Sequence, residues 1–282
     1  MKKVLLPFFY TLLSLALITA CSQPDEIEAG NGSGGGNGGG GNPGSGSGGG
    51  NGIIVSEGLV AYMPFDGNAT DVSGNLNNGS VRGLPESVSG IKGNAYRFNS
   101  IQEGDNGCGL PGGDFVRLPA LGAIWADGFS FAGWVQFDDL RYYERILDFG
   151  NGRGEDGGML ITLSRLDSTN NLALTSWLTE DPVLNRDKGR VVANNAIVKG
   201  QSMYIVATIS AEGAMQIWID GRKVAEKVDG QPVANVAREN IMLGRSSYCR
   251  EDPDFKGLMD EVRIYNRALT REEIQLLYED LN

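Results

Sequence analysis

The sequence predicts an all-β fold, a sandwich of strands that is completed by one short helix. Short segments rich in β-branched and aromatic residues recur along residues 53–282, and Gly, Asn and Asp separate them, as turns between strands require. No alternation of strands with helices and no internal repeat is visible. We therefore expect residues 53–282 to form one domain, since a sandwich of this length is ordinary.

The expected last strand, Gly257–Tyr265, alternates apolar and polar residues, as a strand with one buried face does. In the last strand, Asp260 breaks this rule because it falls on the apolar side, opposite Glu261 and Arg263. A buried carboxylate needs hydrogen-bond donors or a cation, so backbone N–H groups and a metal ion are both open as its partners. The expected strands are Leu59–Phe65, Ala95–Phe98, Phe115–Leu118, Phe129–Phe137, Arg145–Phe149, Met159–Leu163, Leu172–Leu178, Met203–Ser210, Met215–Ile219, Ile241–Leu243 and Gly257–Tyr265.

A short helix is expected after the last strand. Thr270 and Glu273 have the spacing of a capping box, in which each side chain accepts a hydrogen bond from a free N–H at the helix start. Apolar residues then follow at helical spacing, at Ile274, Leu277, Tyr278 and Leu281. Such a short helix is not stable alone, so we expect it to dock on the sandwich.

The amino terminus predicts export. Residues 1–20 carry two lysines and then the apolar run Val4–Ile18, which is typical of a secretory signal peptide rather than of a membrane-spanning helix. The sequence LITAC, ending at Cys21, resembles the bacterial lipobox, and the resemblance implies cleavage before Cys21 and lipidation of this residue. The residue after the cysteine is Ser22 and not Asp, which resembles lipoproteins that are sorted to the outer membrane rather than kept at the inner membrane. The acidic run Asp25–Glu28 is similar to the export tags of surface lipoproteins.

Residues 21–52 are expected to form a tether. Gly30–Gly52 consists almost entirely of Gly, Asn and Ser, so it has nothing to bury and is not expected to fold. A flexible coil of this length has an average reach of roughly 25–30 Å. The tether suits a module that meets a large external partner, and it suits a passive spacer equally well.

Seven sequence blocks occur in one order along the domain: GLVAYMPFDGNATDVSGNLNNGSV, GNAYRFN, DFVRLP, FSFAGWVQF, ILDFGN, MYIVATISAEGAMQIWIDGRKV and FKGLMDEVRIYNRALTREEI. Together they resemble the laminin-G-like branch of the concanavalin A-like lectin/glucanase superfamily. The resemblance implies a jelly-roll sandwich of two antiparallel sheets, one of them concave. It also implies binding of carbohydrate or protein and, in many members, a structural calcium ion.

The resemblance places calcium ligands as well. Asp260 matches an acidic position that binds calcium in the last strand of related glucanases. The other implied ligands lie at Phe65–Asp66 and Asn99–Ser100, so the expected calcium set is Asp260, Asp66 and Asn99. Calcium prefers such sets of carboxylate and carbonyl oxygens.

Three cysteines are present. If Cys21 is lipidated, Cys108 and Cys249 remain, and outside the cytoplasm a disulfide between them is plausible. The resemblance implies that the strands that follow them, Phe115–Leu118 and Gly257–Tyr265, lie side by side, which makes the pairing geometrically reasonable. Two separate buried or capped thiols are the alternative.

Composition excludes several functions. The chain has no histidine, which removes His-dependent triads and His-ligated zinc. Its net charge is -11 without a lysine or arginine cluster in the sequence, which argues against nucleic acid as a partner. The Glu-x-Asp-x-x-Glu motif of related glucanases is absent, and the acidic pairs Glu155/Asp156 and Glu180/Asp181 fall in expected loops. We therefore expect no catalysis, although two carboxylates suffice for glycoside hydrolysis.

Three tryptophans fall in the more polar row of their strands: Trp134, Trp177 and Trp218. Aromatic faces beside hydrogen-bonding groups suit sugar rings, and the indole adds an N–H donor. The alternative is that loops cover this face and bury the indoles as a second small core. Tyr142, Tyr143 and Arg145 form another candidate, in a loop, although a hairpin packed on the sheet would explain these aromatics too.

These observations together favour a non-catalytic surface lipoprotein that binds a polysaccharide or glycoprotein and is held at the outer membrane by its lipid. A structural or adhesive protein whose partner is another protein, without a sugar site, is the alternative. A glycoside hydrolase comes third.

Overall fold

The computed structural model describes residues 55–100, 113–150, 160–165, 170–177, 188–246 and 252–281. The chain divides into two units, residues 1–50 and 51–282, and all described residues belong to the second unit. Within the described residues, no helix is long and apolar enough to cross a membrane.

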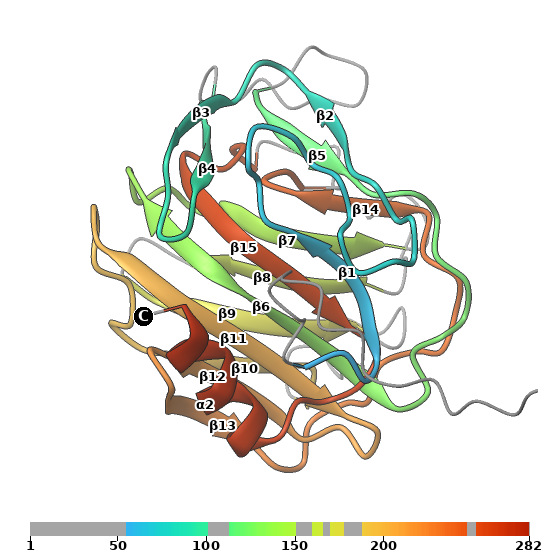
Figure 1. The fold of residues 1–282 in the computed structure, drawn as a ribbon. Helices are drawn as coiled ribbons and strands as arrows, with labels where there is room; N and C mark the ends of the chain where they lie inside the picture. The colour runs from blue at the N-terminus through green and yellow to red at the C-terminus, as the bar shows by residue number, and fades with distance from the viewer. Residues whose placement is uncertain are drawn as a thin grey trace, which may run out of the picture. The chain divides into compact units, whose positions relative to one another are not determined.

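Two antiparallel sheets form the domain, which confirms the predicted all-β sandwich (Figure 1). The eight-stranded sheet runs, edge to edge, through β13 (Arg222–Lys227), β12 (Met215–Ile219), β11 (Ser202–Ser210), β6 (Gly128–Phe137), β15 (Gly257–Tyr265), β4 (Asn94–Phe98) and β3 (Glu86–Ser89), with β1 (Leu59–Met63) also paired to β15. The seven-stranded sheet runs through β10 (Arg190–Ala193), β9 (Leu172–Trp177), β8 (Leu160–Arg165), β7 (Arg145–Gly150), β14 (Asn240–Leu243), β5 (Phe115–Arg117) and β2 (Ser80–Arg82).

Strand β15 joins segments that are distant in the sequence. Its first half pairs with β4, its second half pairs with β1, and β6 lies along its other side. The change of partner coincides with an irregularity in the register to β6 between Asp260 and Arg263, where Glu261 has φ +55°. A bulge of this kind bends the strand, so it allows β15 to serve both partners.

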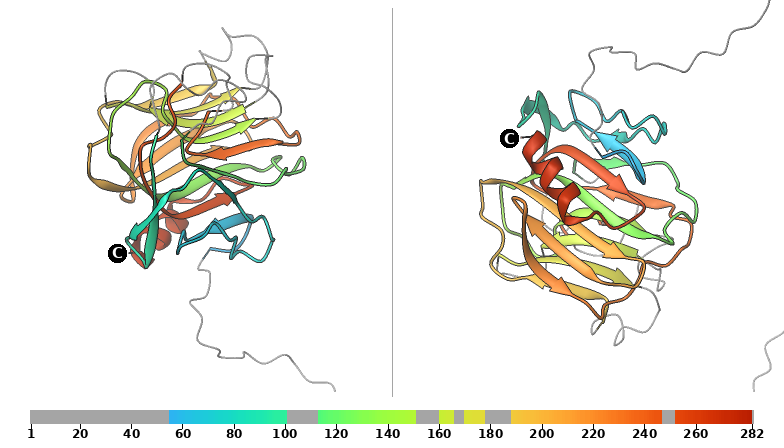
Figure 2. Two further views of the ribbon diagram at one scale, coloured as in Figure 1. Left: turned by 90° about the horizontal axis from the view of Figure 1, so that it is seen from above. Right: turned by 60° about the horizontal axis from the view of Figure 1, so that its bottom comes forward.

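The two sheets lie one over the other (Figure 2). The main core consists of buried side chains from both sheets. Period-two alternation directs Phe129, Phe131, Val135 and Phe137 of β6 into this core, as the sequence predicts. From the seven-stranded sheet, Leu147, Phe149, Leu163, Leu172, Leu174, Ile241 and Leu243 meet them there. This packing leaves the other row of each strand for the outer face of its sheet.

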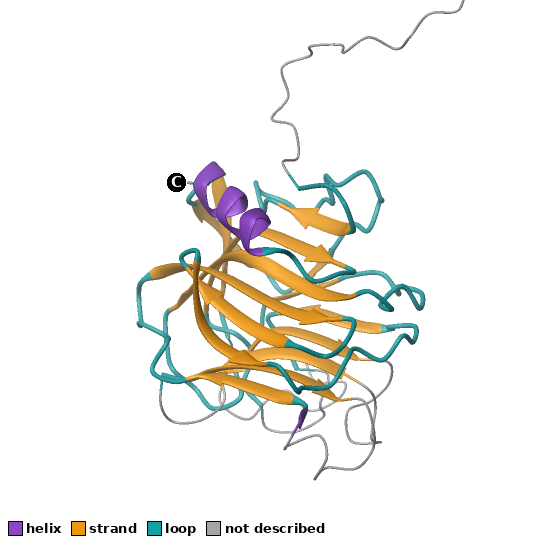
Figure 3. Ribbon diagram, turned by 90° about the horizontal axis from the view of Figure 1, so that it is seen from below, coloured by secondary structure: helices purple, strands orange, loops and turns teal. Residues whose placement is uncertain are grey.

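Helix α2 (Arg271–Asp280) covers part of the outer face of the eight-stranded sheet (Figure 3). The capping box is confirmed: Thr270 Oγ1 accepts from the N–H of Glu273 at 3.2 Å, and Glu273 Oε2 accepts from the N–H of Thr270 at 2.8 Å. Ile274 and Leu277 are the buried residues of the helix. They pack in a second core with Trp134, Tyr204, Val206 and Trp218.

Four strands, β2, β3, β10 and β13, are not predicted from the sequence, and one implied adjacency is wrong. Strand β5 belongs to the seven-stranded sheet, where it pairs with β14 and β2, whereas β15 belongs to the eight-stranded sheet. These two strands therefore do not lie side by side, and the geometric argument for a Cys108–Cys249 disulfide falls with them. Both cysteines, and Cys21, lie outside the described residues.

Candidate functional site

The outer face of the seven-stranded sheet gathers polar side chains. Cross-strand register places Asp148 of β7 opposite Thr162 of β8, Thr162 opposite Thr175 of β9, and Thr175 opposite Arg190 of β10. Directly opposed residues share one face of a sheet, so these residues form a row across four strands. We call the surface made by Arg145, Asp148, Ser164, Thr175, Trp177 and Arg190 the outer polar face.

Hydrogen bonds and ion pairs fix several side chains of the outer polar face. The Nε of Arg190 donates to Thr175 Oγ1 at 3.3 Å. Arg145 Nη2 donates to Asp252 Oδ2 at 2.9 Å, and its Nε lies 3.7 Å from Asp148 Oδ2. Asp148 and Thr175 are buried, whereas Arg190 is half-buried. Arg145 and Ser164 are buried as well, so Trp177 and Arg190 are the residues of this face that reach solvent in part.

Trp177 lies at one end of this face and Arg145 at the other. Trp177 is paired in register with Leu160, while Arg145 is paired with Ser164, four residues further along β8. At a rise of about 3.3 Å per residue, the two positions are about 13 Å apart along the strands. Trp177 is half-buried, so part of its indole reaches solvent. The structure places these two predicted residues on one face without bringing them into contact.

Tyr142 and Tyr143 lie on the connection between β6 and β7, and both are exposed, by 56% and 44%. Their ring centroids are 6.4 Å apart with an interplanar angle of 37°. The flanking residues are anchored: Arg141 Nη1 donates to Ser100 Oγ at 2.9 Å, and Glu144 is fully buried. The tyrosines are therefore held at the surface and are not packed against the sheet.

Trp134 and Trp218 lie on the outer face of the eight-stranded sheet, as their strand parity predicts, but they are only 5% and 6% exposed. Trp134 packs against Tyr204 and against Tyr278 of α2, with ring centroids 5.5 and 6.1 Å away. The two indoles therefore lie in a second small core, which was the alternative to an open sugar-binding face. The covering element is helix α2, whereas loops were expected.

Asp260 and Asp66 both accept hydrogen bonds from the backbone at the turn between β3 and β4. Asp260 is fully buried, and its Oδ2 accepts from the N–H of Ile91 at 2.7 Å, while Asp66 Oδ1 accepts from the N–H of Asn94 at 2.7 Å. A Cβ at Gly93 would lie 2.2 Å from Asp66 Oδ1, which explains the glycine there. Burial raises the pKa of Asp260 to about 7.

Backbone N–H groups thus satisfy one oxygen of Asp260, whereas its buried Oδ1 has no hydrogen-bond partner among the described residues. Asn99 lies at the other end of β4, where its N–H donates to Asp114 Oδ2 at 2.8 Å. Five residues of strand separate it from Asn94, about 16 Å. The structure therefore brings together two of the three expected calcium ligands, and within the described ranges no group of three acidic or cysteine side chains could hold a metal ion. Calcium binding stays a prediction.

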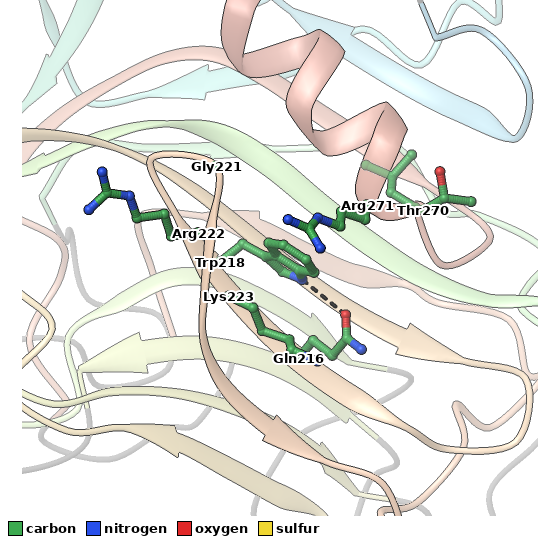
Figure 4. A pocket seen from close by; sticks show the side chains of 8 residues that line it. Gln216, Trp218, Gly221, Arg222, Lys223, Thr270 and Arg271 are labelled. Carbon is green, nitrogen blue, oxygen red and sulfur yellow. Dashed lines mark hydrogen bonds between the residues drawn. The ribbon is translucent and has the colours of Figure 1, made fainter.

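A groove that the sequence analysis misses lies beside helix α2 (Figure 4). It has a volume of about 530 Å³ and is lined by Trp218 and Gln216 of β12, Arg222 and Lys223 of β13, and Arg271 of α2. Nearly 50 residues separate Arg222 and Lys223 from Arg271 in the sequence. The sequence therefore contains no local cluster of positive charge from which the groove could be predicted. Only the docking of α2 on the sheet brings these residues together.

A laminin G family model described as the concanavalin A-like lectin/glucanases superfamily matches residues 110–275. The chain belongs to this superfamily. The match runs from before β5 to the first half of helix α2 and includes strands of both sheets, so it agrees with the sandwich described above. No curated protein matches the chain.

Solved structures of similar fold include members with bound ligands. Domain 4 of the extracellular arabinanase AbnA from Geobacillus stearothermophilus, solved with arabinotriose, has 24% identity and a TM-score of 0.56, and the alignment covers 78% of this chain and 98% of that one. The binding domain of botulinum neurotoxin DC was solved with rat synaptotagmin II, at 14% identity, a TM-score of 0.53 and coverage of 81% and 53%.

The same botulinum domain was also solved with SialylT, at 15% identity, a TM-score of 0.53 and coverage of 80% and 52%. This chain thus spans about half the length of the botulinum chains that it matches. At these identities the likeness establishes the superfamily fold and not a shared ligand.

Proposed function

We propose that this protein is a non-catalytic surface lipoprotein whose laminin-G-like domain binds carbohydrate, either a polysaccharide or the glycan of a glycoprotein. The main evidence for this proposal is the arrangement of side chains on the outer polar face. There, the half-buried indole of Trp177 shares a sheet surface with the hydrogen-bonded pair of Arg190 and Thr175. Sugars combine apolar ring faces with many hydroxyls, and this surface offers partners for both.

The comparisons support this ligand class. A domain of the same fold that this chain covers almost completely was solved with arabinotriose, and another was solved with SialylT. The exposed tyrosines Tyr142 and Tyr143 add a second aromatic surface, near the Arg145 end of the outer polar face. Two aromatic positions separated along one domain suit an extended chain of sugars.

The proposal is tested by glycan-array binding of the full chain and of Trp177→Ala and Tyr142→Ala/Tyr143→Ala variants. We expect Trp177→Ala to weaken binding about tenfold or more, taking for a sugar ring a contribution similar to the about 1–3 kcal/mol that a stacked nucleic-acid base loses on alanine substitution. Trp177→Phe keeps an aromatic face and is expected to retain part of the affinity.

Circular dichroism and the melting temperature of each variant show that it is folded. Undiminished binding by both the Trp177→Ala protein and the double tyrosine variant would place the ligand elsewhere. Release of reducing sugar from a polysaccharide would replace the non-catalytic proposal with a hydrolase.

A protein partner is the second candidate, because the botulinum domain of this fold was solved with synaptotagmin II. An array on which no glycan binds, together with capture of a defined protein ligand that Trp177→Ala does not disturb, would favour it. The two candidates share the same fold, so the ligand decides between them.

A further inference from the structure

The groove beside α2 is built around an oriented indole. Trp218 Nε1 donates to Gln216 Oε1 at 3.0 Å, and Gln216 Nε2 donates to Glu226 Oε1 at 2.7 Å. Lys223 Nζ lies 2.7 Å from the same carboxylate oxygen and 6.0 Å from the centroid of the Trp218 ring. These contacts fix the floor of the groove before any ligand arrives.

Positive charge gathers around this floor, although the chain as a whole has a net charge of -11. Arg222, Lys223 and Arg271 line the groove, and no acidic residue is among the described residues that do so. A second groove of about 690 Å³ shares Gly221, Arg222 and Arg271 with the first. Its acidic residue, Asp220, accepts a hydrogen bond from the backbone N–H of Tyr204 at 2.9 Å.

The acidic side chains near the groove either form ion pairs with other residues or do not line the groove. Glu226 binds Lys223 and Gln216, and Glu273 binds Arg267 at 2.6 Å. Glu272 is exposed in the first turn of α2. Within the described part of the chain, neither Arg222 nor Arg271 forms an ion pair, so two guanidinium groups remain available at the groove.

The position of Arg271 is unfavourable for the fold itself. It is the first residue of α2, where the helix dipole already contributes positive charge, so a cation there is opposed by the helix. A bound anion would interact favourably with both the guanidinium group and the helix terminus. An anionic ligand would therefore offset the unfavourable interaction between the Arg271 side chain and the helix dipole.

We propose that this groove is a second binding site, which takes the anionic group of an acidic sugar, a carboxylate or a sulfate. Arg271 binds the anion, because its planar guanidinium group points toward Trp218 (Figure 4) and matches carboxylate and sulfate oxygens in a two-pronged geometry. Arg222 also lines the groove, but its side chain points away from the indole, so it adds positive charge at the rim. The edge of Trp218 that lines the groove contacts the sugar ring, although most of the indole is buried in the second core. A volume of about 530 Å³ lies in the usual range of small-molecule sites, about 300–1,000 Å³. The sugar class rests on the proposed glycan-binding function, whereas the anion site rests on the groove alone.

The experiment is calorimetric titration of the full chain with oligogalacturonate, with its methyl ester as a neutral counterpart, and with a sulfated galactan oligomer. We expect at least one of the acidic oligomers to bind more tightly than the ester and to lose affinity as salt rises. Arg271→Gln should weaken this binding about tenfold or more, and Arg222→Gln should weaken it less, because Arg222 points away from the indole.

Arg82→Gln, on β2 of the other sheet, is the matched control, since Arg82 is exposed and the change in net charge is the same. It should leave the affinity unchanged, and Arg271→Gln should melt at or slightly above the temperature of the parent. Trp177→Ala should also leave this site intact, which separates it from the outer polar face. Binding of the ester as tight as that of both acids, or unaltered binding by the two arginine variants, would overturn the proposal.

Discussion

Glu144 is buried completely beneath the loop that carries Tyr142 and Tyr143. Its Oε1 accepts from the backbone N–H of Lys256 at 2.6 Å and lies 3.4 Å from Arg141 Nη2. These contacts do not offset the loss of water, so burial raises the pKa of Glu144 from 4.5 to about 7. The Glu144 carboxylate therefore links the connection between β6 and β7 to the segment before β15. Because this carboxylate is buried, its ionisation reduces the stability of the fold, and this loss depends on pH.

Since the folded-state pKa exceeds the unfolded value, the folded state binds the proton more tightly, and stability falls as pH rises from about 4.5 to about 7. The penalty is of the order of 3 kcal/mol above that range. Glu144→Gln removes the ionisable group and keeps an acceptor for Lys256. We expect this variant to match or exceed the parent in stability at pH 8 and to show a flatter pH dependence.

Urea denaturation at pH 5 and pH 8 measures the effect. Glu86→Gln, at an exposed position on β3, is the control with the same change in charge. If the parent and Glu144→Gln lose the same stability between the two pH values, the charged form of Glu144 is not the source of the dependence.

At the scale of the element, helix α2 both closes the second core and forms one wall of the cationic groove. Thr270→Ala removes the side-chain acceptor at its start, which costs about 1 kcal/mol, with a range of about 0.5–2 kcal/mol. Because α2 covers Trp134, we expect fraying of the helix to raise quenching of tryptophan fluorescence by acrylamide. Thr270→Ser retains the hydroxyl and should behave as the parent, and equal loss in both variants would contradict a capping effect.

Most elements that bury one face fully are predicted from the sequence, and strands that are largely exposed are missed. Strand β10 is an exception, because it is missed although Val191 and Ala193 lie in the main core. Strands such as β6 and β11 carry long period-two patterns because the main core selects apolar residues on one side. The missed strands β2, β3 and β13 are largely exposed and lie at or near sheet edges, so no core selects their residues. Helix α2 is predicted because its capping box is local.

For the candidate site residues, too, local features are predicted from the sequence and features that depend on tertiary packing are not. Strand parity predicts which sheet face Trp134, Trp177 and Trp218 occupy, because the side-chain period is local. Parity does not reveal that α2 covers two of the indoles while Trp177 remains half-buried. That distinction depends on the docking of α2 against β11 and β12, a contact between segments more than 50 residues apart.

At the scale of the whole molecule, we propose that the lipid on Cys21 holds the protein at the outer membrane. Cys21→Ser removes the thiol that is lipidated, so we expect the variant to leave the membrane fraction and to retain glycan binding. Fractionation and the mass of the mature amino terminus are the measurements. Ser22→Ala keeps the cysteine and should remain with the membrane. A Cys21→Ser protein that still sediments with membranes would show that another segment anchors it.

Strand β15 follows every other strand along the chain and yet lies inside the eight-stranded sheet, between β6 on one side and β4 and β1 on the other. Until it is in place, three earlier strands lack a neighbour, and such distant pairings form slowly. The eight-stranded sheet therefore closes only after the last strand has been synthesised. If the protein is exported as its amino terminus predicts, we expect the part of the chain before β15 to stay incompletely folded until β15 has followed it across the membrane.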